Sequence, residues 1–271
     1  LIFGLPLDTR DSFIEVLNRT IERGFDNVNV LNLLLMDGVE MSRPDFRKKY
    51  DIKTKYRILG THYTKHKGTF IAEHEEVVVS SNTFSYEDFL EVRYLGFMFF
   101  STFQLNFQRW FFQFARHLGI NVTDFFSRFV KPDRNDNWPK GYLRFLDDFK
   151  AAIEGELFDS REEMVAKVKE MYEANNNDVG ESSRINVYFG GRLNYLEADW
   201  IKEVLLRHLD MMHENLSSED RNLASLLIDL FERQRIDLKN IGEKEPLNIS
   251  FDVINWQKNK FKESLHKLEM P

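Results

Sequence analysis

The sequence has 271 residues and contains no cysteine. This absence excludes disulfide bonds, thiolate nucleophiles, zinc sites built from cysteine and any iron–sulfur cluster ligated from within the chain. A strong positive charge is also missing, since the formal net charge is -7. Because a dedicated nucleic-acid binder needs a basic surface, we expect no nucleic-acid partner.

Long apolar runs are absent as well. The most apolar stretch, Tyr94 to Phe114, is interrupted by Gln104, Asn106, Gln108, Arg109 and Gln113. A membrane span needs about 20 mostly apolar residues, so we expect no span here. No export signal is visible in these 271 residues, and the cytoplasm is therefore the default expectation.

Aromatic residues are plentiful, with 25 Phe, 9 Tyr and 4 Trp. Many of them fall between Phe97 and Phe114, on a stretch that we predict to be one long helix from Ser85 towards Leu118. Aromatic side chains would cover nearly all sides of this helix, and a helix that is apolar all round is buried or docked. We expect it to anchor the helical region, or alternatively to form a wall of an apolar substrate pocket.

The first 83 residues have the pattern of an α/β unit. Leu1–Leu5 and Asn27–Leu35 are apolar strands, and between them a helix begins near Asp8 or Thr9 and ends before Gly24. Strand, helix and strand over this length predict a βαβ unit with a parallel sheet. The pattern continues with a short helix or turn at 43–50, a basic loop at 51–67 and a strand at 69–80.

Helices dominate from residue 84 onward. Ser85 with Asp88 and Ser160 with Glu163 have the spacing of capping boxes, and Ser217 or Ser218 caps a further helix. These caps and the helical spacing predict a series of helices, two short strands and a polar linker. We therefore divide the chain into an α/β domain of residues 1–83 and a mainly helical domain of residues 84–271. The predicted helices are 121–130, 140–153, 161–175, 197–215 and 218–235, the strands are 184–189 and 247–253, and the linker is 175–183.

Three segments resemble one enzyme family. LIFGLPLDTRDSF (residues 1–13) and GFDNVNVLNLLLMDGVEM (residues 24–41) look like the fifth and sixth barrel strands of radical S-adenosylmethionine enzymes. The segment IAEHEEVVVSSNTFSYEDFLEVR (residues 71–93) resembles the stretch after the barrel in members that carry a cobalamin-binding domain. The resemblance implies the C-terminal part of a parallel, partial TIM-like barrel, followed by the helical domain.

The resemblance also implies cofactors and site residues. The full-length enzyme would bind S-adenosylmethionine and a 4Fe-4S cluster, and possible cobalamin use follows from residues 71–93 alone. Ile2 matches the apolar position that packs on the adenine of S-adenosylmethionine, and Leu31 and Leu33 match positions of the next strand near the adenine. Ordinary barrel core remains the alternative interpretation of all three side chains.

Two family features are not in this sequence. The C-x-x-x-C-x-x-C loop that holds the cluster is absent, and so is the D-x-H-x-x-G motif of cobalamin binding. We therefore expect a C-terminal fragment that is inactive alone, with the upstream portion of the same polypeptide as its partner. The substrate, a small or lipid-like molecule, and the catalytic residues stay unknown.

Two other classes of function remain open. The chain could be a non-catalytic helical interaction module, which predicts that the aromatic helix is exposed to a partner. It could also be a hydrolase or transferase that uses carboxylates at strand ends, where Asp8 and Asp37 stand.

The histidines and the acidic strand give weaker signals. We expect His62 and His66 on a strand or loop, without a metal, and His208 and His213 on a helix surface. Glu73, Glu75 and Glu76 are expected to be solvated.

Overall fold

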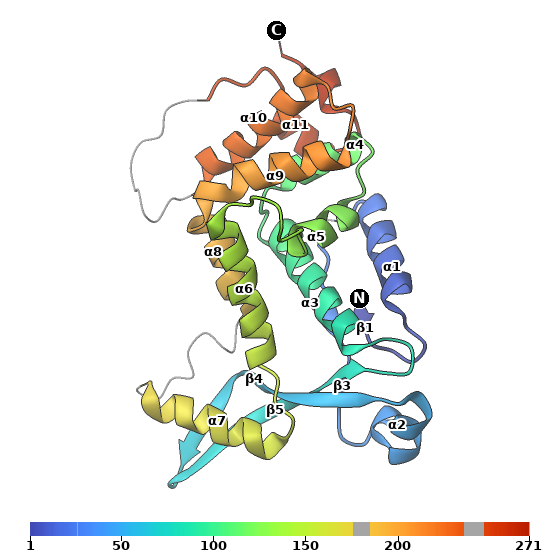
Figure 1. Cartoon of the computed structure of the whole chain (residues 1–271), viewed down its shortest axis with the longest axis vertical. Helices are drawn as coiled ribbons and strands as arrows, with labels where there is room; N and C mark the ends of the chain where they lie inside the picture. Colours follow the sequence, from blue (N-terminus) through green and yellow to red (C-terminus); the bar gives the residue numbers. More distant parts are fainter. Residues whose placement is uncertain (26, 176–184, 236–246, 271) are drawn as a thin grey trace. The chain divides into compact units, whose positions relative to one another are not determined.

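The computed structural model describes residues 1–25, 27–175, 185–235 and 247–270 (Figure 1). Its contacts divide the chain into two compact units. Unit 1 comprises 1–15, 29–97 and 146–189, and unit 2 comprises 16–28, 98–145 and 190–271, each only as far as it is described. The domain boundary expected between residues 83 and 84 stays a prediction, and the compact units divide the chain at other places.

The predicted βαβ unit is present. β1 (Ile2–Phe3) is followed by α1 (Arg10–Glu22) and then by β2 (Leu31–Asn32), which pairs with β1 in parallel. Thr9 begins the helix, because its hydroxyl accepts a hydrogen bond from the Ser12 amide at 3.1 Å.

The predicted strand 27–35 is two strands rather than one. After β2, the chain passes Leu33 and forms β3 (Leu34–Leu35), which pairs antiparallel with β5 (Thr69–Ser80). The change of partner occurs at Leu33, whose carbonyl accepts a hydrogen bond from the Val78 amide at 3.0 Å. Two different sheets therefore share one apolar run.

The described residues form no closed barrel. They contain the parallel pair β1–β2 and an antiparallel sheet with the strand order β3–β5–β4, so the fold is mixed α/β and rich in helices. β4 (Lys53–His66) corrects our prediction of a basic loop at 51–67. Lys67 and Gly68, with φ of 48° and 83°, join β4 to β5 through a two-residue turn in which both residues are left-handed.

The rest of unit 1 covers this hairpin. η1 (Glu40–Ser42) and α2 (Pro44–Tyr50) precede β4, and α7 (Arg161–Ala174) packs on both strands of the hairpin. Ile58 and Ala72 of the strands form a buried cluster with Met164 and Val168 of α7. Ser160 caps α7 as predicted, with its hydroxyl 3.1 Å from the Glu163 amide.

Two predictions near residue 180 have different outcomes. The linker 175–183 lies outside the described residues except for Asn175. The predicted strand 184–189 is wrong, because α8 (Ile185–Tyr195) occupies this segment as far as it is described. Its β-branched and aromatic residues favour a strand locally, but Ile185 and Phe189 are spaced to bury one helical face.

Unit 2 consists of helices. The predictions for α5 (Val122–Val130), α6 (Lys140–Gly155), α9 (Ala198–Met212) and α10 (Ser218–Gln234) are confirmed to within a few residues, although the last turns of α6 belong to unit 1. The predicted strand at 247–253 is wrong: Phe251 forms only an isolated bridge with Glu269, and α11 (Val253–Lys258) begins two residues later. A short turn, η4 (Leu265–Leu268), follows.

The predicted aromatic helix is broken in the middle. α3 (Tyr86–Phe99) passes into a π-helical turn, η2 (Phe100–Gln104), and α4 (Arg109–His117) begins after Asn106 and Gln108 have adopted left-handed φ angles of 57° and 48°. The capping box is confirmed, since the Asp88 amide donates to the Ser85 hydroxyl at 3.1 Å. No helix of the described chain has the length and apolarity needed to cross a membrane.

The aromatic side chains of this segment are buried, as predicted. Phe111 and Phe125 pack edge to face with ring centroids 5.6 Å apart, which links α4 to α5 inside unit 2. An interaction module that used these rings would need them exposed, and the described structure does not expose them. The buried aromatic residues of this segment in unit 2 are Phe99, Phe103, Phe107, Trp110, Phe111, Phe112 and Phe114.

Candidate functional site

The parallel pair β1–β2 presents an apolar surface. Ile2 and Leu31 are direct register partners, so their side chains point to the same face of the pair. Both are exposed, Ile2 by 46% and Leu31 by 56%. No strand of the described chain pairs with the outer edge of β1. Two predicted site residues therefore lie side by side on an open surface.

Leu33, the third predicted site residue, does not join them. Its side chain is only 6% exposed and lies in the core of unit 1. A Cβ atom on Gly4 would stand 3.3 Å from the Leu33 Cβ, which shows how closely the end of β1 approaches this side chain. The environment of Leu33 is that of a core residue.

The turn after β1 is held by Asp8. Its carboxylate accepts hydrogen bonds from the Leu5 amide at 3.0 Å and from the Gly4 amide at 3.2 Å. Leu7, inside this turn, has a φ of 72°, which is a strained conformation for a leucine. The carboxylate of Asp8 therefore orders the strand end. That role differs from the acid–base role that the hydrolase alternative would need.

The acidic segment of β5 is partly buried, which corrects our expectation of three solvated glutamates. Glu76 receives two hydrogen bonds from Arg47, at 2.6 and 2.8 Å, and one from the Thr54 hydroxyl at 2.6 Å. Burial by itself would raise the pKa of Glu76, but these hydrogen bonds hold it below its usual value. Glu73 alone is exposed.

A second group of charges lies deeper in unit 1. Arg57 of β4 contacts Glu75 at 2.6 Å and Glu156, just after α6, at 3.5 Å. Arg93 of α3 contacts the same Glu156 oxygen at 3.4 Å and donates to the Asn186 side chain at 2.7 Å. Two guanidinium groups thus face two carboxylates, so their charges sum to zero.

The two arginines differ in their surroundings. Burial opposes the charge of Arg57, but Glu156 and Glu75 together raise its pKa. Burial lowers the pKa of Arg93, whose Nε atom has no hydrogen-bond partner among the described residues. An arginine stays charged in either case. Arg93 is therefore a buried cation that depends on one long carboxylate contact.

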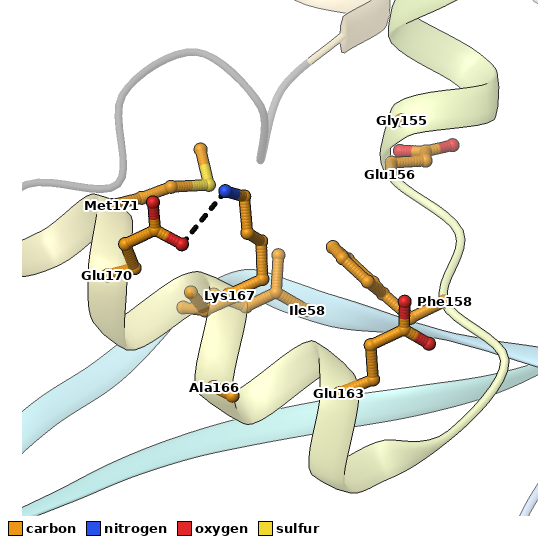
Figure 2. Close-up of a pocket in the computed structure, with 10 residues that line it drawn as sticks. Ile58, Gly155, Glu156, Phe158, Glu163, Ala166, Lys167, Glu170 and Met171 are labelled. Carbon is orange, nitrogen blue, oxygen red and sulfur yellow. Dashed lines mark hydrogen bonds and ion pairs between the residues drawn. The ribbon is translucent and has the colours of Figure 1, made fainter.

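A cavity of about 480 Å³ opens beside these charges (Figure 2). Ile58, Phe158 and Met171 supply much of its apolar wall, and Glu156 stands at its edge. Figure 2 shows Lys167 and Glu170 of α7 joined by an ion pair of 2.9 Å at the rim. A cavity of this size fits a small molecule, and its wall can bury an apolar group.

The sequence did not reveal this charge cluster. Arg93 and Glu156 are separated by 62 intervening residues and belong to no short motif. The pairing of Arg57 with Glu75 follows from the hairpin register, so recognising β4 as a strand would have indicated it. The structure also corrects the placement of His208, which is buried rather than on a helix surface.

The described residues fit one of the two expected cofactors, S-adenosylmethionine, better than the other, the iron–sulfur cluster. The chain contains no cysteine, and the described residues contain no group of three potential metal ligands, so they do not suit an iron–sulfur cluster. The exposed pair Ile2 and Leu31 suits one face of a flat, apolar ring. The sequence matches no family model and no curated protein in the comparisons.

Proposed function

We propose that this chain is the C-terminal portion of a radical S-adenosylmethionine enzyme and that its β1–β2 pair packs on the adenine of S-adenosylmethionine. The observation that carries the proposal is the exposed register pair of Ile2 and Leu31 on two parallel strands. Parallel strands are normally covered on both faces. The exposed apolar face of this pair is therefore a surface on which a further apolar or aromatic group can pack.

The surroundings of the pair support the same proposal. Leu1 precedes β1, Leu5 and Leu7 follow it closely, and all three side chains are exposed. Contiguous exposed apolar groups mark a surface that binds another group. We propose that further parallel strands, from the upstream portion of the same polypeptide, cover the free edge of β1. Together with β1 and β2, these strands would form the partial TIM-like barrel that we propose.

In the complete enzyme, reductive cleavage of S-adenosylmethionine at the cluster would supply a 5′-deoxyadenosyl radical. This chain has no cysteine to hold the cluster, so the cluster ligands would come from the upstream portion of the polypeptide. Ile2 and Leu31 would hold the adenine, and apolar side chains around it would exclude water. The chain alone is expected to be inactive.

The remaining features of the proposal rest on the resemblance. Cobalamin use is a prediction from residues 71–93, which cover most of β5 and the first part of α3. The substrate is unknown, and the apolar cavity of Figure 2 is where unit 1 would accommodate an apolar substrate group. A cytoplasmic location belongs to the same proposal, as does the expectation that the helical region covers the substrate.

The proposal is tested on the polypeptide that includes its upstream portion. We expect Ile2→Asp and Leu31→Asp each to weaken S-adenosylmethionine binding at least tenfold, while iron content stays unchanged, because a buried carboxylate against adenine is unfavourable. Val187→Asp, at another exposed apolar position of unit 1, is the matched control. Unchanged affinity in both strand variants would remove the pair from the site. An upstream reading frame without the cysteine motif would overturn the family assignment.

A further inference from the structure

We propose that unit 2 contains a separate binding site for an aromatic oxyanion, a small molecule in which a ring carries a carboxylate or phosphate. The site is a pocket of about 380 Å³ between the start of α4, the end of α8, the end of α10 and α11. Its lining combines two arginines, three aromatic rings and several side-chain amides. The described lining contains no aspartate and no glutamate. This inference is independent of the function proposed above.

The aromatic side chains define where a ring would lie. Trp110 is mostly buried, and its indole N–H donates to the Gln257 side chain at 2.8 Å, which fixes the plane of the indole. Phe231 packs edge to face on Phe107, with centroids 6.1 Å apart. Tyr195 is 41% exposed at the rim. Fixed rings around a concave pocket favour an aromatic ligand.

The arginines define the charge of the ligand. Arg235 is held in place, because its Nε donates to Glu232 and its Nη1 donates to the Asn194 carbonyl at 2.8 Å. Glu232 offsets the charge of Arg235. Arg109 lies over the ring of Phe261, at 5.5 Å from its centroid, and brings a second positive charge to the pocket. Guanidinium groups bind carboxylates and phosphates through paired hydrogen bonds.

The backbone around the pocket is strained. Asn106, which lines the pocket, and Gln108 have φ angles of 57° and 48°, directly after the π-helical turn η2. Such conformations cost free energy, and they persist where the surrounding structure fixes them, often at binding sites. Gln108 is fully buried, and its amide nitrogen donates to Glu232 at 3.1 Å. The strained turn thus supports the carboxylate that holds Arg235.

The experiment compares three ligands that share a phenyl ring and differ in charge. The full chain is labelled with ¹⁵N and titrated with phenylacetate, phenylacetamide and phenethylammonium, and the indole N–H signals of its four tryptophans are followed by NMR. Trp110→Phe identifies the signal of Trp110. We expect phenylacetate to shift this signal and to bind at least about tenfold more tightly than the neutral and cationic ligands.

A fourth ligand, phenyl phosphate, distinguishes the two oxyanions. Tighter binding than phenylacetate assigns the site to phosphates, and weaker binding assigns it to carboxylates. Equal affinity for the anionic, neutral and cationic ligands would overturn the proposal, because the pocket would then bind the ring alone. No shift of the Trp110 signal with either anion, up to its solubility limit, would also overturn it.

Variants locate the charge that matters. We expect Arg109→Gln to weaken anion binding at least about tenfold. Arg109→Lys should retain only part of the binding, because an ammonium keeps the charge but cannot form the paired hydrogen bonds. Arg144→Gln removes an exposed arginine elsewhere in unit 2 and serves as the control. The three other indole signals report whether each variant is folded. If Arg109→Gln binds phenylacetate as tightly as the unmodified chain, Arg109 does not bind the anion and the site as proposed is wrong.

Discussion

The indole of Trp138 stacks on the imidazole of His208, with ring centroids 4.7 Å apart and planes inclined by 21°. His208 is 1% exposed, and its Nε2 lies 3.2 Å from the Tyr142 hydroxyl. Its Nδ1 has no hydrogen-bond partner among the described residues. Burial, together with the positive charges of Arg128 and Arg207, lowers the pKa of His208 to about 4. The imidazole is therefore neutral inside unit 2 at pH 7.

This neutral imidazole makes stability depend on pH. In the unfolded chain, His208 binds a proton below about pH 6.5, whereas in the folded chain it does so only below about 4. Between these values the unfolded state binds more protons, so the free energy of unfolding rises with pH across this window. The loss on acidification is about 3 kcal/mol from this residue. Urea unfolding at a series of pH values measures it.

His208→Phe should remove this dependence. The phenyl ring keeps the aromatic packing but does not titrate, so the slope of stability between pH 4 and 6.5 should flatten. His66→Gln, at an exposed histidine of β4, is the control and should leave the slope unchanged. A slope that persists in His208→Phe would show that other groups cause it.

Glu156 should be the most sensitive of the paired carboxylates. Glu156→Gln leaves Arg93 without a carboxylate partner among the described residues and takes one of two from Arg57. Removing one partner of a buried ion pair costs about 3–5 kcal/mol. Urea unfolding should show a loss of this size. Glu154→Gln, at an exposed position two residues earlier, should change stability by less than about 0.5 kcal/mol.

Glu76 should contribute most at neutral pH. Glu76→Gln weakens the two hydrogen bonds from Arg47, and hydrogen bonds to charged groups are worth about 1.5–3 kcal/mol. The lowered pKa of Glu76 means that its stabilisation is lost as pH falls below the ordinary carboxyl range. The difference between the variant and the unmodified chain should therefore shrink as pH falls from 7 towards 3. Glu73→Gln, on the exposed part of β5, should show no such difference.

Two glycines of α6 should respond in opposite directions. A Cβ atom at Gly141 would lie 2.6 Å from Cδ1 of Trp200, so Gly141→Ala must displace a buried indole and should destabilise the chain by about 1–3 kcal/mol. At Gly155 a Cβ atom would meet nothing within 4 Å. Gly155→Ala should stabilise the helix by up to about 1 kcal/mol. Thermal unfolding of the two variants compares them, and a loss at both positions would contradict the packing described here.

Local signals in the sequence determined many of the elements. Ser85, Ser160 and Ser217 each cap a helix where the capping pattern predicted one, because the hydroxyl satisfies an amide only three residues away. The parallel pairing of β1 with β2 also follows from the sequence, since a helix connects two apolar strands. These features depend on neighbours along the chain.

Tertiary contacts decided the rest. One apolar run is divided into β2 and β3 at Leu33, because the amide of Val78, far along the chain, donates to the Leu33 carbonyl. Ile185 to Phe189 is a helix although its residues favour a strand, since two of its side chains are buried on one helical face. His208 is buried by Trp138 and Tyr142, and Arg93 meets Glu156 across a long separation. Spacing along the sequence shows which face a residue occupies, but only the folded chain fixes what that face meets and whether a charge there finds a partner.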